Sequence, residues 1–325
     1  MKFFVFTKQR LLILGCCVIT CILAVSICFS SYSGVVSAST TERKIPIYCV
    51  EKEEKVVSIS FDAAWGNEQT QTLLDILDNY KVKTTFFLVG QWADKYPDSV
   101  KDIAKAGHDV GNHSNTHPHM PQMSSKQMLD ELNDCNDKIE KLIGKRPTLF
   151  RPPYGDYNNT LVETVNSINM YCVQWDIDSL DWKDPTPQQM VDRIKKKLQP
   201  GSIILLHNGA KNTPEALPLI IEMIKGEGYE IVPISQILLK GAYTTDHEGR
   251  MHSSEQSATS AASSAAASSA AASSKAVSAL SPETASATQP AVASQTPGDA
   301  VSSLEEGAPD VSAMYPDIEF AEDLN

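Results

Sequence analysis

Between residues 44 and 240, short apolar runs alternate with longer amphipathic runs. This alternation is typical of an α/β domain in which helical crossovers connect the strands. About seven strand–helix units in succession favour a closed or nearly closed barrel over an open, doubly wound sheet. No G-x-G-x-x-G follows the first apolar run, which argues against a dinucleotide-binding domain. We predict strands at residues 56–61, 84–88, 109–111, 149–151, 171–175, 203–206 and 230–232.

Four of the runs between these strands carry apolar residues three and four positions apart, which is the spacing of an amphipathic helix. Ser124 or Ser125 is suited to cap the longest of them. Pro214 stands near a predicted helical N-terminus, where proline is favoured. We predict helices at residues 67–80, 125–143, 186–198 and 214–225.

The C-terminal part of the chain differs sharply in composition. Residues 251–325 are rich in Ser, Ala, Thr and Pro, and they contain ten Asp and Glu residues and one Lys. We expect this tail to be disordered, because it has too little apolar surface to offset the entropy of ordering. It contributes a net charge of −9 to the total of −12, which leaves −3 for the rest. The rest is nearly neutral, so no basic patch indicates nucleic acid as a partner.

The N-terminal part contains 19 uncharged residues, 11–29, a length sufficient for a transmembrane helix. Lys2, Lys8 and Arg10 precede them, which predicts a cytoplasmic N-terminus and export of the residues after the span. The alternative is a signal peptide cleaved near Ala38. With the first interpretation, the protein is a single-pass cell-membrane protein; with the second, it is secreted. Both interpretations place the folded domain outside the cytoplasm.

The predicted organisation therefore has four parts. Residues 1–38 form a cytoplasmic stub with an anchor or signal segment, and residues 39–55 form a linker and the entry to the domain. Residues 56–240 form the α/β domain, and residues 241–325 form the acidic, Ala- and Ser-rich tail. We expect a monomer.

Polar residues follow several of the predicted strands. Asp62, His113 and His207 each stand at such a position, Arg151 is the last residue of a predicted strand, and Asp181 lies shortly after another. In parallel barrels the functional residues gather at the C-terminal ends of the strands. We therefore expect these side chains to lie together.

His113 and His117 are four residues apart, a spacing that suits one divalent metal ion, although a chain with seven His produces such a pair by chance as well. Arg151 precedes two prolines and is either a surface residue or a fixed partner for a carboxylate. His207 is either a buried structural histidine or a proton donor. In the second case an acid such as Asp181 would fix its tautomer and raise its pKa.

Two tryptophans stand beside these residues in the sequence. Trp65 follows Asp62 by three positions, and Trp182 follows Asp181 directly. Either ring is suited to line a sugar-binding site, but tryptophan is more often a packing residue. Both interpretations stay open at this point.

Taken in order, five segments resemble the motifs of the polysaccharide deacetylases with the nodulation-protein homology domain, carbohydrate esterase family four. The resemblance covers about residues 56–237. It implies a distorted (β/α)7-type barrel, a divalent metal that is often zinc, and removal of N-acetyl or O-acetyl groups from cell-wall polymers such as peptidoglycan or chitin. The segments are Ser60-Phe61-Asp62-Ala63, His113-x-x-x-His117, Arg151-Pro152-Pro153-Tyr154-Gly155, Asp178-Ser-Leu-Asp181-Trp182 and Leu205-Leu206-His207.

The resemblance also implies roles for individual residues. Asp62 would be the general base, oriented by Arg151, and His207 would be the general acid, supported by Asp181. The backbone N–H of Tyr154 would help to hold the oxyanion. His113 and His117 would bind the metal.

The sequence departs from the family pattern at Ala63, where a second Asp usually serves as a metal ligand. An alanine methyl group coordinates nothing, so the metal is in question. A non-catalytic, carbohydrate-binding member of the family is therefore the main alternative. A metal-dependent peptidase is less favoured, because no H-E-x-x-H is present. The segment FDAAWGN resembles a sporulation-associated branch of the family from spore-forming Gram-positive bacteria.

Overall fold

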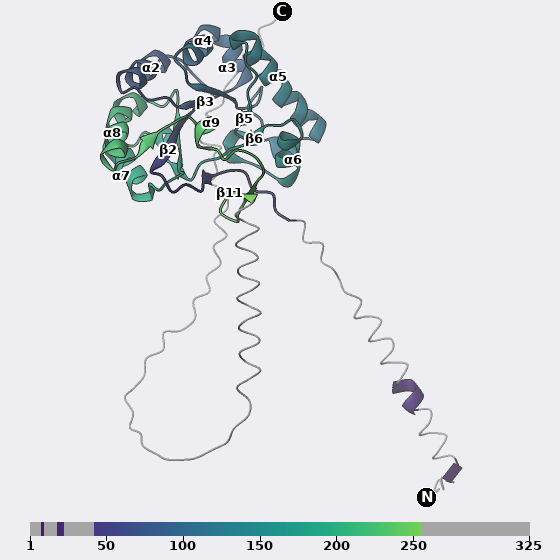
Figure 1. Ribbon diagram of the computed structural model, residues 1–325. Helices are drawn as coiled ribbons and strands as arrows, with labels where there is room; N and C mark the ends of the chain where they lie inside the picture. Colours follow the sequence, from purple (N-terminus) through teal and green to yellow (C-terminus); the bar gives the residue numbers. More distant parts are fainter. Residues whose placement is uncertain (1–7, 10–17, 23–41, 255–325) are drawn as a thin grey trace, which may run out of the picture. The chain divides into compact units, whose positions relative to one another are not determined.

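The computed structural model describes residues 8–9, 18–22 and 42–254 (Figure 1). The chain divides into two units, Met1–Arg43 and Lys44–Asn325. In the first unit, the described residues 8–9 and 18–22 are helical. No helix within the described ranges is long and apolar enough to span a bilayer. The predicted single-pass membrane location is corrected on this finding. Most of the predicted span 11–29, and the cleavage site near Ala38, lie outside the described residues.

A parallel sheet forms the centre of the second unit. Its strand order is β6-β5-β4-β3-β2-β8-β7, and β9 pairs with the first residues of β2. The sheet curls but is not closed, since within residues 42–254 no ladder joins β6 to β7. The predicted α/β barrel is thus confirmed as a distorted, incomplete one. The strands are β2 (Val56–Ala63), β3 (Thr85–Leu88), β4 (Asp109–Asn112), β5 (Leu149–Phe150), β6 (Tyr171–Cys172), β7 (Ile177–Asp178), β8 (Ile203–His207) and β9 (Glu230–Ile231).

Helices surround this sheet on the outside, as Figure 1 shows. The longest, α5, has the predicted bounds because both ends are specified locally. Ser124 and Gln127 form a capping box at its start, and Gly144 ends it in the left-handed conformation with φ of 70°. The α-helices are α2 (Thr70–Asn79), α3 (Gly90–Lys95), α4 (Pro97–Lys105), α5 (Ser125–Ile143), α6 (Asn159–Ser167), α7 (Pro187–Lys197), α8 (Thr213–Gly226) and α9 (Ile234–Ile237), with 3-10 turns η1 (Met120–Gln122), η2 (Pro153–Gly155) and η3 (Asp181–Lys183).

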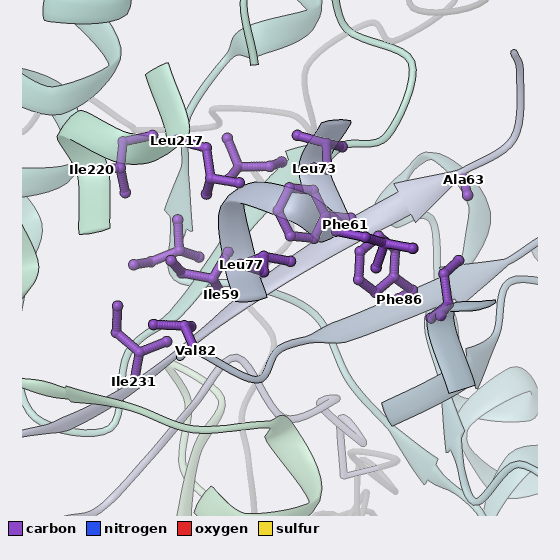
Figure 2. Close-up of a cluster of buried hydrophobic side chains, with 14 of the residues drawn as sticks. Ile59, Phe61, Ala63, Leu73, Leu77, Val82, Phe86, Leu217, Ile220 and Ile231 are labelled. Carbon is purple, nitrogen blue, oxygen red and sulfur yellow. The ribbon is translucent and has the colours of Figure 1, made fainter. Parts of the chain in front are cut away.

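The main apolar cluster lies between β2 and the helices α2 and α8 (Figure 2). Because side chains alternate along a strand, Phe61 and Ala63 belong to this cluster, whereas Ser60 and Asp62 point to the opposite face. The ring of Phe61 stacks on that of Phe86 at 4.8 Å. The two faces of β2 thus have separate roles, one in packing and one in the polar interior of the barrel.

A second, three-stranded sheet lies outside the predicted domain range 56–240. It consists of β1 (Cys49–Val50), β11 (Arg250–Ser253) and β10 (Tyr243–Thr245), in that order. These residues were predicted to belong to the linker and to the tail, because the pairing of Cys49 with Arg250 joins distant parts of the chain and leaves no local signal. Residues 255–325 of the predicted tail lie outside the described residues.

Candidate active site

Asp62 and His207 lie side by side at the C-terminal edge of the sheet. Asp62 is the penultimate residue of β2 and His207 is the last residue of β8, and the parallel ladder pairs them directly. Both are buried. The backbone N–H of Asn208 donates to the carbonyl oxygen of Asp62 at 2.9 Å, which extends the ladder by one bond. Since paired residues in parallel strands point to the same face, both side chains enter the barrel interior.

Arg151 holds the carboxylate of Asp62. Its guanidinium is fully buried, with Nη1 donating to Asp62 Oδ1 at 2.7 Å. Its Nη2 donates to Ser60 Oγ at 2.9 Å and to the Gln174 carbonyl oxygen at 3.1 Å. The ring of Phe87 lies 4.1 Å from the guanidinium carbon. Arg151 is therefore not a surface residue, and Asp62 Oδ2 remains directed away from it.

Asp181 holds His207 in a similar way. Its Oδ1 lies 2.7 Å from His207 Nδ1, and its Oδ2 accepts from the His207 backbone N–H at 2.6 Å and from Thr213 Oγ1 at 2.8 Å. Burial lowers the pKa of His207, but the charge and hydrogen bond of Asp181, with the charge of Asp62, outweigh it and raise that pKa. Nδ1 faces the carboxylate, so Nε2 is the ring nitrogen left for a reacting group.

His113 follows β4 and lies between Arg151 and Asp62. Its Nδ1 is 2.8 Å from the Arg151 carbonyl oxygen. Because a carbonyl only accepts, Nδ1 carries the proton and Nε2 carries the lone pair. Nε2 lies 3.5 Å from Asp62 Oδ2 and has no hydrogen-bond partner within residues 42–254. Burial lowers the pKa of His113, so the ring is neutral near pH 7.

His117 lies next to His113, with ring centroids 4.9 Å apart. Burial, with the neighbouring His113, holds the pKa of His117 well below its usual range. The two imidazoles that the spacing predicted to lie together do so.

A catalytic zinc ion normally has three protein ligands. Here the third position is missing, because Ala63 presents its methyl group to the apolar cluster. Oδ1 of Asp62 is already bound to Arg151. In the part of the chain that the structure describes, no group of three His, Cys, Asp or Glu side chains is arranged to hold a metal. The residues present therefore do not fit a three-ligand metal site, and the predicted zinc has no part in the proposed chemistry.

The aromatic residues predicted for substrate binding lie in different surroundings. Trp65 packs on His207, with ring centroids 5.3 Å apart, and a Cβ at Gly209 would lie 2.5 Å from its Nε1. The ring of Tyr154 lies between His117 at 4.5 Å and His119 at 4.1 Å. Tyr154 also has a left-handed backbone, with φ of 60°.

Trp182 directly follows Asp181 in η3. Its indole N–H is buried and has no hydrogen-bond partner within residues 42–254. The ammonium of Lys183 lies 4.5 Å from the centre of its ring. Trp182 is thus the chain neighbour of a residue of the candidate site, and the ammonium of Lys183 lies over one face of its ring.

Three groups that hold the site were not predicted from the sequence. Ser60 had a signal that was available, because it lies two residues before Asp62 on the same face of a strand. The carbonyl of Gln174 and the hydroxyl of Thr213 had none, because both reach the site from distant parts of the chain.

Known proteins share this sequence pattern and fold. The polysaccharide deacetylase family profile matches residues 50–173. The peptidoglycan-N-acetylmuramic acid deacetylase PdaC of Bacillus subtilis is 37% identical over 188 residues, which are 58% of this chain and 40% of PdaC. A peptidoglycan-N-acetylglucosamine deacetylase of Bacillus cereus is 33% identical over 194 residues, which are 58% of this chain and 91% of that protein. The chain thus spans less than half the length of PdaC but nearly all of the second relative.

A solved structure with a similar fold comes from Bacillus anthracis. It is described as a pseudoenzyme of carbohydrate esterase family 4, is 36% identical, and superimposes with a TM-score of 0.58 over 60% of this chain and 69% of its own. A mutant of the same protein, described as having restored enzymatic activity, is 37% identical and also superimposes with a TM-score of 0.58, over 60% of this chain and 71% of its own.

Proposed function

Because this chain belongs to the polysaccharide deacetylase family, we propose that it hydrolyses the acetamido groups of a cell-wall polysaccharide and releases acetate. The observation that carries the proposal is the direct pairing of Asp62 with His207 on neighbouring strands. Asp62 pairs with the buried guanidinium of Arg151, and His207 pairs with the buried carboxylate of Asp181. This arrangement supplies one proton acceptor and one proton donor on the same side of the sheet.

In the proposed reaction, Asp62 is the general base. Its free oxygen removes a proton from water, and the water oxygen forms a bond to the acetyl carbonyl carbon. Arg151 keeps the carboxylate oriented through its hydrogen bond at 2.7 Å. His207 then donates its Nε2 proton to the nitrogen as the C–N bond breaks, which yields a free amine and acetate. Asp181 favours the protonated form of His207 that this step requires.

Three further residues are proposed to contact the substrate. The backbone N–H of Tyr154 stabilises the oxyanion of the tetrahedral intermediate. Trp65 and Trp182 line the sugar-binding surface, one beside His207 and the other beside Asp181.

Peptidoglycan is the proposed substrate. The names of the two bacillar relatives specify peptidoglycan, one at N-acetylmuramic acid and the other at N-acetylglucosamine. A cell-wall substrate favours an extracytoplasmic location for the reaction. The monomeric state, the domain boundaries and the sporulation-associated branch stay predictions.

Ala63 favours a second candidate function. A family member without the third ligand would bind carbohydrate without hydrolysing it, and the similarity to a pseudoenzyme supports this alternative. Retention of both Asp62 and His207 with their buried partners favours the catalytic proposal.

Incubation of the full chain with N-acetylated peptidoglycan and with chitin oligomers separates the candidates. We expect free acetate and sugar products that have lost an acetyl group. Binding without acetate release would support the non-catalytic alternative and contradict the proposal. Peptide stems with new amino termini would instead indicate a peptidase or amidase.

A further inference from the structure

The turn between His113 and His117 has an unusual backbone. Ser114 and His117 both adopt positive φ values, 67° and 61°, although neither is glycine. Such residues cost energy and persist only where the surrounding structure holds them. The contacts that hold this turn therefore decide where the two imidazoles lie.

Glu131 of α5 makes three of these contacts. Its Oε2 accepts from the backbone N–H groups of Asn115 and Thr116, each at 2.8 Å. Its Oε1 accepts from Thr116 Oγ1, also at 2.8 Å. One carboxylate thus satisfies two backbone donors and one hydroxyl at the centre of the turn.

The opposite side of the turn is held by α3. The N–H groups of Gly90 and Gln91 donate to the carbonyl oxygens of Ser114 and Asn115, each at 2.9 Å. The approach is close, because a Cβ at Gly90 would lie 2.4 Å from Asn115 Oδ1. The centre of the turn is therefore held from two sides, with the carbonyl groups of Ser114 and Asn115 bound to α3 and the N–H groups of Asn115 and Thr116 bound to Glu131. The N–H groups of Ser114 and His117 are bound within the segment itself, by Asn112 Oδ1 and Ser114 Oγ.

Glu131 is not needed for the ends of its own helix. The N-terminus of α5 has a complete capping box from Ser124 and Gln127, and Gly144 supplies the C-terminal cap. The three bonds of Glu131 all lead to the turn, so its contribution is to the site rather than to α5.

We propose that Glu131 is a positioning residue for the active site, acting through the turn that carries His113 and His117. This inference rests on the proposed function. His113 lies between the Arg151 carbonyl and Asp62. If the turn relaxes, His113 moves, and the environment of the proposed base changes with it. A displacement on the order of 1 Å near reacting groups is sufficient for a large loss of rate.

The test compares Glu131→Ala with Glu131→Gln. We expect Glu131→Ala to lower kcat for acetate release by about tenfold or more, with KM within about twofold of the wild type. Glu131→Gln should restore kcat to within about threefold, because the amide oxygen accepts the two N–H groups and the amide nitrogen donates to Thr116 Oγ1. The imidazole NMR resonances of His113 and His117 should shift in the first variant and stay near wild-type positions in the second.

Glu140→Ala is the matched control, since Glu140 lies on the same helix and pairs with exposed Arg146. It should leave both kcat and the resonances unchanged. If Glu131→Ala does not fold, Glu131→Asp replaces it, since its carboxylate stops one methylene short of the turn and the same changes are expected.

The proposal is overturned if Glu131→Ala, or Glu131→Asp in its place, keeps the wild-type kcat and unchanged histidine resonances. It is also overturned if Glu140→Ala lowers kcat by the same factor. If the wild type releases no acetate, the proposed function fails. The resonances then still test whether Glu131 positions the turn, because they do not depend on activity.

Discussion

Three buried histidines lie in the candidate site, and their pKa values shift in opposite directions in its two regions. The acid–base region contains His207 with Asp62, and the two-histidine region contains His113 and His117. In the acid–base region, Asp181 raises the pKa of His207 against the effect of burial. In the two-histidine region, burial prevails and lowers the pKa of His113 and of His117. The same side chain at similar burial is therefore favoured as a cation in one region and as a neutral base in the other. The charged partner therefore decides which form of the ring is favoured. Burial sets only how strong the interaction with that partner must be before the cation is favoured.

The two regions also differ in completeness. Asp62 and His207 each have the partner that their proposed role requires. His113 and His117 have the lone-pair chemistry of metal ligands but not the third ligand, because Ala63 contributes a methyl group to the core. The difference indicates that the groups for proton transfer are complete in this site and that those for metal binding are not.

Removal of the proposed acid should have the largest effect. We expect His207→Ala to lower kcat for acetate release by about 100-fold or more, because protonation of the departing nitrogen is lost. His247→Ala is the control, since that side chain is 89% exposed. Equal activity in the two variants would remove His207 from the mechanism.

Removal of the partner should change the pH dependence. The proposed acid acts only when protonated, so activity should fall as the pH rises through the raised pKa of His207. Asp181→Asn removes the charge that raises this pKa, and the alkaline fall in activity should move to lower pH, with a loss of about tenfold at pH 7. A pH–rate profile from about pH 5 to 9 measures this. An unchanged alkaline limb would contradict the assignment.

Chelation tests whether the two-histidine region holds a metal that the reaction needs. Because the donor set does not fit a three-ligand site, we expect dialysis against EDTA to change acetate release by less than about twofold. Metal analysis of protein purified without chelator should find well under one equivalent. One full equivalent together with loss of activity on dialysis would show that another ligand replaces the missing carboxylate.

The aromatic residue beside His207 should have the smallest effect. Trp65→Phe keeps a ring against the imidazole but reduces the contact area. We expect KM to rise about two- to fivefold with kcat nearly unchanged, as for a modest loss of aromatic contact. A large fall in kcat would instead indicate that Trp65 fixes the orientation of His207.

Long helices and strands such as α5, β2 and β8 could be predicted from the sequence. The periodic apolar residues and local caps of α5 indicated its bounds, and the apolar runs of β2 and β8 identified the central strands. Several elements were not predicted, among them the short β7, β10 and α9 and the nine-residue helices α4 and α6. The uncharged run at residues 11–29 predicted a membrane location that the structure does not support.

For the candidate site, the strand-end residues were accessible but their supports were not. Asp62 and His207 each follow an apolar run, and that position alone predicted that they would meet. Glu131 and Thr213 lie on helices and reach the site only through the tertiary fold. No local pattern distinguishes them from surface residues of the same type.

The most direct test of the account is acetate release from N-acetylated peptidoglycan by the wild type and by Asp62→Asn. This change keeps the shape of the side chain and removes the proposed base. We expect acetate from the wild type and a loss of about 100-fold or more in the variant. Equal release by both proteins, or none by the wild type, would contradict it.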